Sequence, residues 1–255
     1  MDIDGIAEFL KITADEVINP RFRQLSDGDI EEKRPGDLVT IADREAEDHL
    51  AAQLRTAYPD ATIVGEETVF LGTSATSMIA EAEHAFVIDP IDGTRNFVHG
   101  NPEHGVMLAE VRKGVTTRGW IWQPHFDRMY TVEKGAGDVL INGKPAERSA
   151  KHKPPLGASG SRYVGFDGGG KLQPTIHSSG AACFDYPNTM AGDIDFMYFS
   201  NAHPWDHLAG ALMLAETGGT ARMLSGEDYS ASTTGKGLLI ARTIDIWELV
   251  APLLK

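Results

Sequence analysis

Three short acidic motifs constrain the fold of this chain more than any other feature of its sequence. They are Gly65-Glu66-Glu67-Thr68, Asp89-Pro90-Ile91-Asp92-Gly93-Thr94 and Trp205-Asp206. Each has an ordinary interpretation when taken singly, because Asp-Pro and Asp-Gly are common turn dipeptides and Asp206 could simply cap a helix. Together they require a further explanation, because burying like charges near a core costs several kcal/mol unless a cation or hydrogen-bond donors offset this cost.

The chemistry of these motifs predicts a magnesium site. Carboxylates with a backbone carbonyl and open water positions suit Mg²⁺, a hard cation that prefers oxygen ligands and keeps several waters. The nine histidines show no clustered ligand spacing, which disfavours zinc. The single cysteine, Cys183, excludes an intramolecular disulfide, fits a reducing compartment and has little support as a nucleophile.

The charge of the chain limits its partners. A formal net charge of −14 argues against nucleic acid or anionic lipid, and a negatively charged substrate would need bound cations. The acidic N-terminus lacks the basic and apolar regions of a secretory signal, and no segment approaches the roughly 20 apolar residues of a membrane-spanning helix. We therefore expect a cytoplasmic protein that binds neither nucleic acid nor membrane.

The pattern of apolar residues predicts an α/β protein with two halves, residues 1–146 and 147–255. Helical spacing indicates an opening helix from Ile3 to Val17 and a second helix over about Asp43–Ala57. Short strands run into the first two acidic motifs, and three further strands form an antiparallel meander. The Ser-, Gly- and Pro-rich stretch 146–180 holds either the junction of the halves or a mobile loop, and a later helix is expected from Asp206, as its N-cap, to Gly218-Gly219.

The motifs resemble those of the inositol monophosphatase family. The string from Asp89 to Thr94 matches D-P-[IL]-D-G-T, Gly65-Glu66-Glu67 matches G-E-E, and Trp205-Asp206 with Ala209-Gly210 matches W-D-x-x-A-G. Asp37-Leu38-Val39-Thr40 followed by Asp43 is similar to the D-x-V-T-x-x-D segment of the family. The likeness spans almost the whole chain and is weakest between about Lys151 and Gly180. It implies a five-layer αβαβα sugar-phosphatase fold with metals between the two halves, and a homodimer.

The resemblance also implies a set of metal ligands. One Mg²⁺ would be held by Glu66, Asp89 and the carbonyl of Ile91, and a second by Asp89, Asp92 and Asp206, so that Asp89 bridges the two. A third, weaker ion would lie near Glu66, with Asp43 behind it.

Phosphate monoester hydrolysis supports these roles independently, because it requires an activated water and relief of charge on the phosphoryl and leaving oxygens. Glu66 and Thr94, the latter hydrogen-bonded towards Asp43, are the groups expected to orient that water or accept its proton. The backbone N–H groups of Gly93 and Thr94, at the start of a short helix, would bind phosphate. We therefore expect a Mg²⁺-dependent phosphomonoesterase that acts on a small phosphorylated metabolite.

The residues that would contact the leaving group depart from the inositol-type pattern. The resemblance places the amide of Ala182, in a G-x-A turn, against the substrate. Phe199 stands seven residues before Asp206, where inositol-type members have a glutamate for ring hydroxyls, so we expect little preference for myo-inositol 1-phosphate. Either Phe199 packs against a flatter leaving group, or it fills the core and an acid such as Asp185 or Asp195 replaces the missing carboxylate.

Several alternatives remain open at this point. Arg95 is either a cation on the substrate side or a solvated side chain, and Lys33 receives no role because its spacing to Asp37 differs by one residue from the inositol-type pattern. The sequence D-G-T-R also resembles histidinol-phosphate phosphatases, and a bisphosphate nucleotide phosphatase or a fructose-1,6-bisphosphatase would share the metal site. From a different class, the chain could be a regulator that binds RNA polymerase or another protein.

Overall fold

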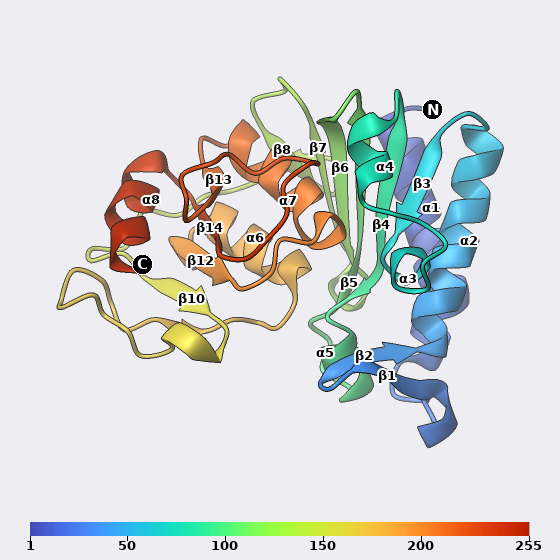
Figure 1. Ribbon diagram of the computed structural model, residues 1–255, viewed down its shortest axis with the longest axis horizontal. Helices are drawn as coiled ribbons and strands as arrows, with labels where there is room; N and C mark the ends of the chain where they lie inside the picture. The colour runs from blue at the N-terminus through green and yellow to red at the C-terminus, as the bar shows by residue number, and fades with distance from the viewer. Residues whose placement is uncertain (255) are drawn as a thin grey trace.

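Two β-sheets alternate with three layers of helix in the computed structural model, which describes residues 1–254 (Figure 1). The outer layer on one side holds α1 (Ile3–Thr13) and α2 (Ile41–Ala57), the middle layer holds α6 (Ala182–Ala191) and α7 (Pro204–Glu216), and α8 (Ile244–Val250) covers the other side. This is the predicted αβαβα arrangement, and it confirms the fold class.

The first sheet contains the predicted antiparallel meander, which continues a parallel pair of strands. Its strands lie in the order β3 (Thr62–Gly65), β4 (Ala85–Asp92), β5 (Gly105–Arg112), β6 (Val115–Gln123), β7 (Arg128–Glu133), β8 (Val139–Ile141) and β9 (Lys144–Pro145). Only β3 and β4 run parallel. Every residue of β4 is buried, because helices cover both faces of the sheet.

The second sheet is mixed and lies wholly in the later half of the sequence. Its order is β11 (Ile176–His177), β10 (Gly157–Ser159), β12 (Phe196–Phe199), β14 (Leu238–Ala241) and β13 (Thr220–Met223). A separate hairpin of β1 (Ile30–Arg34) and β2 (Asp37–Thr40) lies beside α5 (Thr94–Val98), beyond the ends of the strands of the first sheet (Figure 1). The remaining short helices are α3 (Glu66–Phe70), α4 (Ser77–Glu81), a π-helical extension of α1 (Ala14–Ile18) and the 3₁₀ turns Asn19–Arg21, Asp27–Asp29, Pro124–Phe126, Ser161–Tyr163 and Ala251–Leu253.

Alternation along β4 divides the core between the two faces of the first sheet. Phe86 and Ile88 point to the cluster beneath α1 and α2, whereas Val87 belongs to the cluster that the sheet shares with α6 and α7. This second cluster contains residues from both halves of the chain. A third, smaller cluster lies under α8. Among residues 1–254, no helix combines the length and the apolar character that crossing a membrane would require.

The start of α7 corrects one expectation. The helix begins at Pro204, with His203 as its N-cap residue, so the prediction that Asp206 is the N-cap was wrong. Proline suits the first helical position because it has no N–H that would need a partner there. Asp206 instead lies within the first turn, where its side chain is free to face the neighbouring layer.

A candidate metal and phosphate site between the two halves

Three carboxylates from distant parts of the chain meet beside the end of β4. Glu66 is the first residue of α3, Asp89 lies in β4 and Asp206 lies in the first turn of α7. One ligand oxygen from each lies within 4.8 Å of the other two, which is close enough for all three to bind one metal ion. The structure therefore brings together one acid from each of the three predicted motifs.

A β-bulge in β4 sets the direction of the acids in the central motif. Asp89 pairs with Met107 and Asp92 pairs with Gly105, so two residues of β4 stand opposite one residue of β5. Such a bulge also accommodates Pro90, which cannot donate a hydrogen bond to the sheet. The shift brings Asp89 and Asp92 to the same end of the strand and exposes the Ile91 carbonyl to side-chain donors.

Gly93 allows the chain to turn directly from β4 into α5. Its φ of +81° lies in the left-handed region, and an added Cβ would lie 2.8 Å from the Cβ of Ala181. Only glycine fits this close approach between the two halves. As predicted, the N–H groups of residues 93 and 94 stand at the beginning of a short helix.

Asp89 carries the clearest sign that the cluster is built for a cation. Its Oδ1 is buried and has no hydrogen-bond partner among the described residues. Burial, reinforced by Glu66, Asp92 and Asp206, raises the pKa of Asp89 well above its usual value. Burial, again reinforced by Glu66, raises the pKa of Asp206 in the same way. A divalent cation would supply both the missing partner and the missing charge, so these residues fit Mg²⁺.

Asp92 lies next to this cluster but is not one of its three members. Its Oδ2 accepts a hydrogen bond of 2.6 Å from the backbone N–H of Cys183, which fixes the carboxylate against α6. Burial raises the pKa of Asp92 to about 6, although this hydrogen bond opposes the effect. The Cys183 thiol is itself fully buried, and burial raises its pKa well above the ordinary value, which agrees with the expectation that it is no nucleophile.

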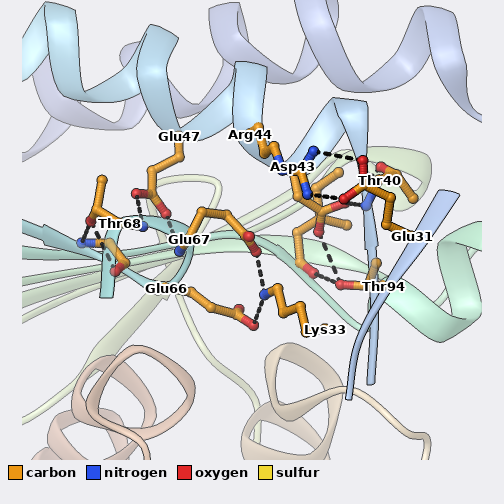
Figure 2. A network of polar contacts seen from close by, with 12 residues as sticks. Glu31, Lys33, Thr40, Asp43, Arg44, Glu47, Glu66, Glu67, Thr68 and Thr94 are labelled. Atoms are coloured by element: carbon orange, nitrogen blue, oxygen red, sulfur yellow. Dashed lines mark hydrogen bonds and ion pairs between the residues drawn. The ribbon is translucent and has the colours of Figure 1, made fainter. Parts of the chain in front are cut away.

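The predicted contact between Thr94 and Asp43 is present (Figure 2). The Thr94 Oγ1 lies 3.0 Å from Asp43 Oδ1 and also 3.0 Å from the carbonyl oxygen of Ile91. The other carboxylate oxygen of Asp43 accepts hydrogen bonds from the N–H and hydroxyl of Thr40, which makes it part of the capping box of α2. Burial raises the pKa of Asp43 to about 6.

Lys33, which the sequence left without a role, reaches into the site from β1 (Figure 2). Its ammonium group lies 2.7 Å from Glu66 Oε1 and also pairs with Glu67, and its side chain is only 3% exposed. Burial favours the neutral amine, but Glu66 and Glu67 outweigh it and raise the pKa of Lys33. The lysine therefore stands as a fixed cation beside the acidic cluster.

Glu47 is a second residue that sequence reasoning missed. Its carboxylate accepts hydrogen bonds from the backbone N–H groups of Glu67, at 2.7 Å, and Thr68, at 2.9 Å, and so holds the start of α3 (Figure 2). A Cβ on Gly65 would lie 2.1 Å from its carboxylate carbon, which explains the glycine there. The only available signal was its position four residues after Asp43 on the buried face of one helix.

A small cavity adjoins the acids on the side of the second half. It has a volume of about 220 Å³, and Asp92, Ala182, Asp185, Phe199 and Asp206 are among the residues that line it. Ala182 and Phe199, which the resemblance to inositol-type enzymes places beside the substrate, both line this cavity.

Arg95 and Asp195 line neither this cavity nor the larger one around Lys33. Arg95 donates a hydrogen bond of 2.7 Å from Nη2 to the carbonyl of Gly36, in the turn between β1 and β2. Asp195 is buried elsewhere and contacts His152 and Arg242. Of the two acids considered as replacements for the missing glutamate, only Asp185 is in the right place.

The family model described as "Inositol monophosphatase family" matches residues 2–252. The chain belongs to the inositol monophosphatase family. A Thermotoga maritima protein named fructose-1,6-bisphosphatase/inositol-1-monophosphatase is 32% identical over 209 residues, which cover 78% of this chain and 77% of that protein. The solved structure of a Thermotoga maritima IMPase has a TM-score of 0.81 at 28% identity and covers 98% of this chain and 95% of its own.

A third relative supports the fold alone. The structure of an IMPase/NADP phosphatase complexed with Mg²⁺ and phosphate has a TM-score of 0.81 at 23% identity, covering 96% of this chain and 91% of its own. As a member of the inositol monophosphatase family, the chain is a metal-dependent phosphoric monoester hydrolase. This confirms the class of activity predicted from the acidic motifs.

Proposed function

We propose that this chain hydrolyses the phosphate monoester of a small metabolite with Mg²⁺ held between its two halves. The observation that carries the proposal is the buried, partnerless oxygen of Asp89 between Glu66 and Asp206. Two ions would be held, the first by Glu66, Asp89 and the Ile91 carbonyl and the second by Asp89, Asp92 and Asp206, with a third, weaker ion near Glu66. The Mg²⁺ and phosphate bound by the IMPase/NADP phosphatase of the same fold support this choice of metal.

Bound Mg²⁺ would neutralise charge on the phosphoryl oxygens and make a water more acidic. The residues of the chain accept the proton, orient the water and bind the phosphate. Thr94 Oγ1 lies 3.0 Å from Asp43 Oδ1, so that a proton taken up by the hydroxyl can pass to that carboxylate. Glu66, together with Thr94, orients the attacking water. The N–H groups of Gly93 and Thr94 bind the phosphate, and the left-handed turn at Gly93 brings this backbone close to it.

Removal of a metal ligand tests the proposal most directly. Asp206→Asn and Asp92→Asn each remove an anionic ligand of the same ion, so we expect both variants to fold and to lose at least 100-fold in kcat/KM on glycerol 2-phosphate. Asp193→Asn is the matched control, because Asp193 is exposed and lies outside the cavities. Near wild-type turnover of either ligand variant at saturating Mg²⁺ would reject the assignment.

Metal dependence gives an independent test. Dialysis against EDTA should abolish activity, and Mg²⁺ should restore it. Excess Ca²⁺ should inhibit, because it accepts the same carboxylates with longer bonds and looser geometry. Full activity after extensive dialysis against EDTA would exclude a metal mechanism.

A further inference from the structure

The cavity beside Phe199 is small, and its lining offers no cationic side chain to a second anion. Its volume of about 220 Å³ is below the roughly 300–1,000 Å³ of pockets that hold drug-sized ligands. Its lining contains three aspartates, Asp92, Asp185 and Asp206, and no lysine or arginine. His207 also lines it, but both nitrogens of its ring already have partners, the Tyr186 hydroxyl and the Asn201 carbonyl oxygen, each at 3.2 Å. A leaving group with a second phosphate would find no cation there.

Asp185 has one carboxylate oxygen that the protein does not use. Both hydrogen bonds to its side chain, from the N–H and the hydroxyl of Ser179, go to Oδ1, at 3.0 and 2.9 Å. Oδ2 accepts none from the described residues, and Asp185, which is only 3% exposed, lines the cavity. A carboxylate oxygen that lines a cavity and has no donor from the protein can accept one from a ligand, and a cationic donor binds it most strongly.

Phe199 gives the cavity a flat apolar wall. The ring stacks on Tyr186, with centroids 5.6 Å apart and planes at 18°, and meets His207 edge-on at 4.7 Å. These contacts fix the ring, yet the residue is only half-buried and part of it faces the cavity. A fixed aromatic wall suits a ring or an ammonium group, and it offers nothing to the hydroxyls of a polyol.

From these three features we propose that the substrate is the monophosphate ester of a small amino alcohol that carries a flat ring. Its ammonium group binds Asp185 Oδ2 and its ring packs against Phe199. This specificity rests on the proposed function, because it assumes that the phosphate lies at the neighbouring acids.

Substrates that differ by one group at a time test the proposal. L-Histidinol phosphate carries both the ammonium group and the ring, and its deamino analogue lacks only the ammonium group. We expect kcat/KM to fall at least tenfold when the ammonium group is removed. Inositol 1-phosphate and fructose 1,6-bisphosphate should be poorer substrates than histidinol phosphate by at least the same factor. A wild-type preference for inositol 1-phosphate or for the bisphosphate would overturn the proposal.

Variants of the cavity connect the specificity to its residues. Asp185→Asn keeps an oxygen for the Ser179 donors but loses the charge, so it should lower kcat/KM at least tenfold for histidinol phosphate and less than twofold for its deamino analogue. Phe199→Leu should lower kcat/KM for histidinol phosphate and for its deamino analogue, and should leave kcat/KM for glycerol 2-phosphate unchanged. Asp193→Asn should change none of these values. An equal loss on all substrates for Asp185→Asn would show a purely structural role and overturn the proposal. Absence of Mg²⁺-dependent hydrolysis of glycerol 2-phosphate by the wild type would instead reject the proposed function itself.

Discussion

His104 illustrates how a single buried side chain sets a property of the whole protein. The residue is 1% exposed, and its ring lies 4.7 Å from that of Phe22 and 5.0 Å from that of Phe97. Burial lowers the pKa of His104 to about 4, so the folded protein keeps this ring neutral at pH values where an unfolded chain would protonate it. Such a difference in proton binding makes stability depend on pH.

We predict that His104→Phe makes the stability of the protein less sensitive to acid. The lowered pKa contributes stability that is fully present above about pH 6.5, and this contribution is lost as the pH falls from about 6.5 towards about 4. The slope is at most about 1.4 kcal/mol per pH unit for one histidine. Urea unfolding of wild type and variant between pH 7 and pH 4.5 measures the difference.

The control for this experiment is the corresponding change at the exposed residue His177. His177→Phe should leave the dependence of the free energy of unfolding on pH as in the wild type. Parallel profiles for wild type and His104→Phe would contradict the prediction, whatever the absolute stability of the variant.

At the scale of elements, the β1–β2 hairpin is fastened to the site by Arg95. The hydrogen bond from Arg95 to the Gly36 carbonyl joins α5 to the turn of the hairpin, and Lys33 on β1 joins the same hairpin to Glu66. Arg95 is exposed and lines neither of the cavities beside the acids. The geometry therefore favours a positioning role for Arg95 over contact with the substrate.

We predict that Arg95→Ala raises the Mg²⁺ concentration for half-maximal activity by about threefold to tenfold, the equivalent of one hydrogen bond of about 0.5–1.5 kcal/mol. The KM for substrate at saturating Mg²⁺ should stay the same, because the loosened hairpin disturbs Lys33 and Glu66 and leaves the leaving-group cavity intact. Arg55→Ala, at an exposed position of α2, is the control. A raised KM with unchanged Mg²⁺ dependence would show instead that Arg95 binds substrate.

Elements could be predicted from the sequence wherever a local pattern was sufficient. The helical pattern over about Asp43–Ala57 predicted α2, and short apolar runs predicted β4 and the meander. The N-cap of α7 was misplaced because Asp206 is a good capping residue by composition, whereas its carboxylate is used by the tertiary structure.

The candidate site was predictable to the extent that its residues lie in short motifs. Glu66, Asp89 and Asp206 could be named because each stands in a recognisable string, and the structure brings these three together. Glu47 and Lys33 could not be named from the sequence. Their hydrogen-bond and ion-pair partners depend on how α2 and β1 pack against α3, and no local sequence pattern encodes that packing.

At the scale of the whole molecule, the two halves share one core. The cluster between the sheets contains Met107 and Ile121 from the first half and Leu208 and Met213 from α7. Without α6 and α7, one face of the seven-stranded sheet would expose this apolar surface to water, at a cost of about 25 cal/mol per Å².

We predict that residues 1–146 and 147–255, produced separately, do not unfold cooperatively, and that the whole chain unfolds in a single transition. Differential scanning calorimetry of the three proteins measures this, and near-ultraviolet circular dichroism reports whether aromatic side chains are fixed. Cooperative unfolding of either half alone would show that the halves are independent domains, a division that stays a prediction until then.

The separation of the three carboxylates along the sequence also has a consequence for synthesis on the ribosome. Asp206 follows Glu66 by more than half of the chain, and it lies on the helix that covers the seven-stranded sheet. A nascent chain that ends before α7 carries two of the acids, but it lacks the third acid and one of the two helices that cover this face of the sheet. We therefore expect catalysis to begin only after translation has nearly finished, and an incomplete product to be inactive and open to proteases that degrade exposed apolar surfaces.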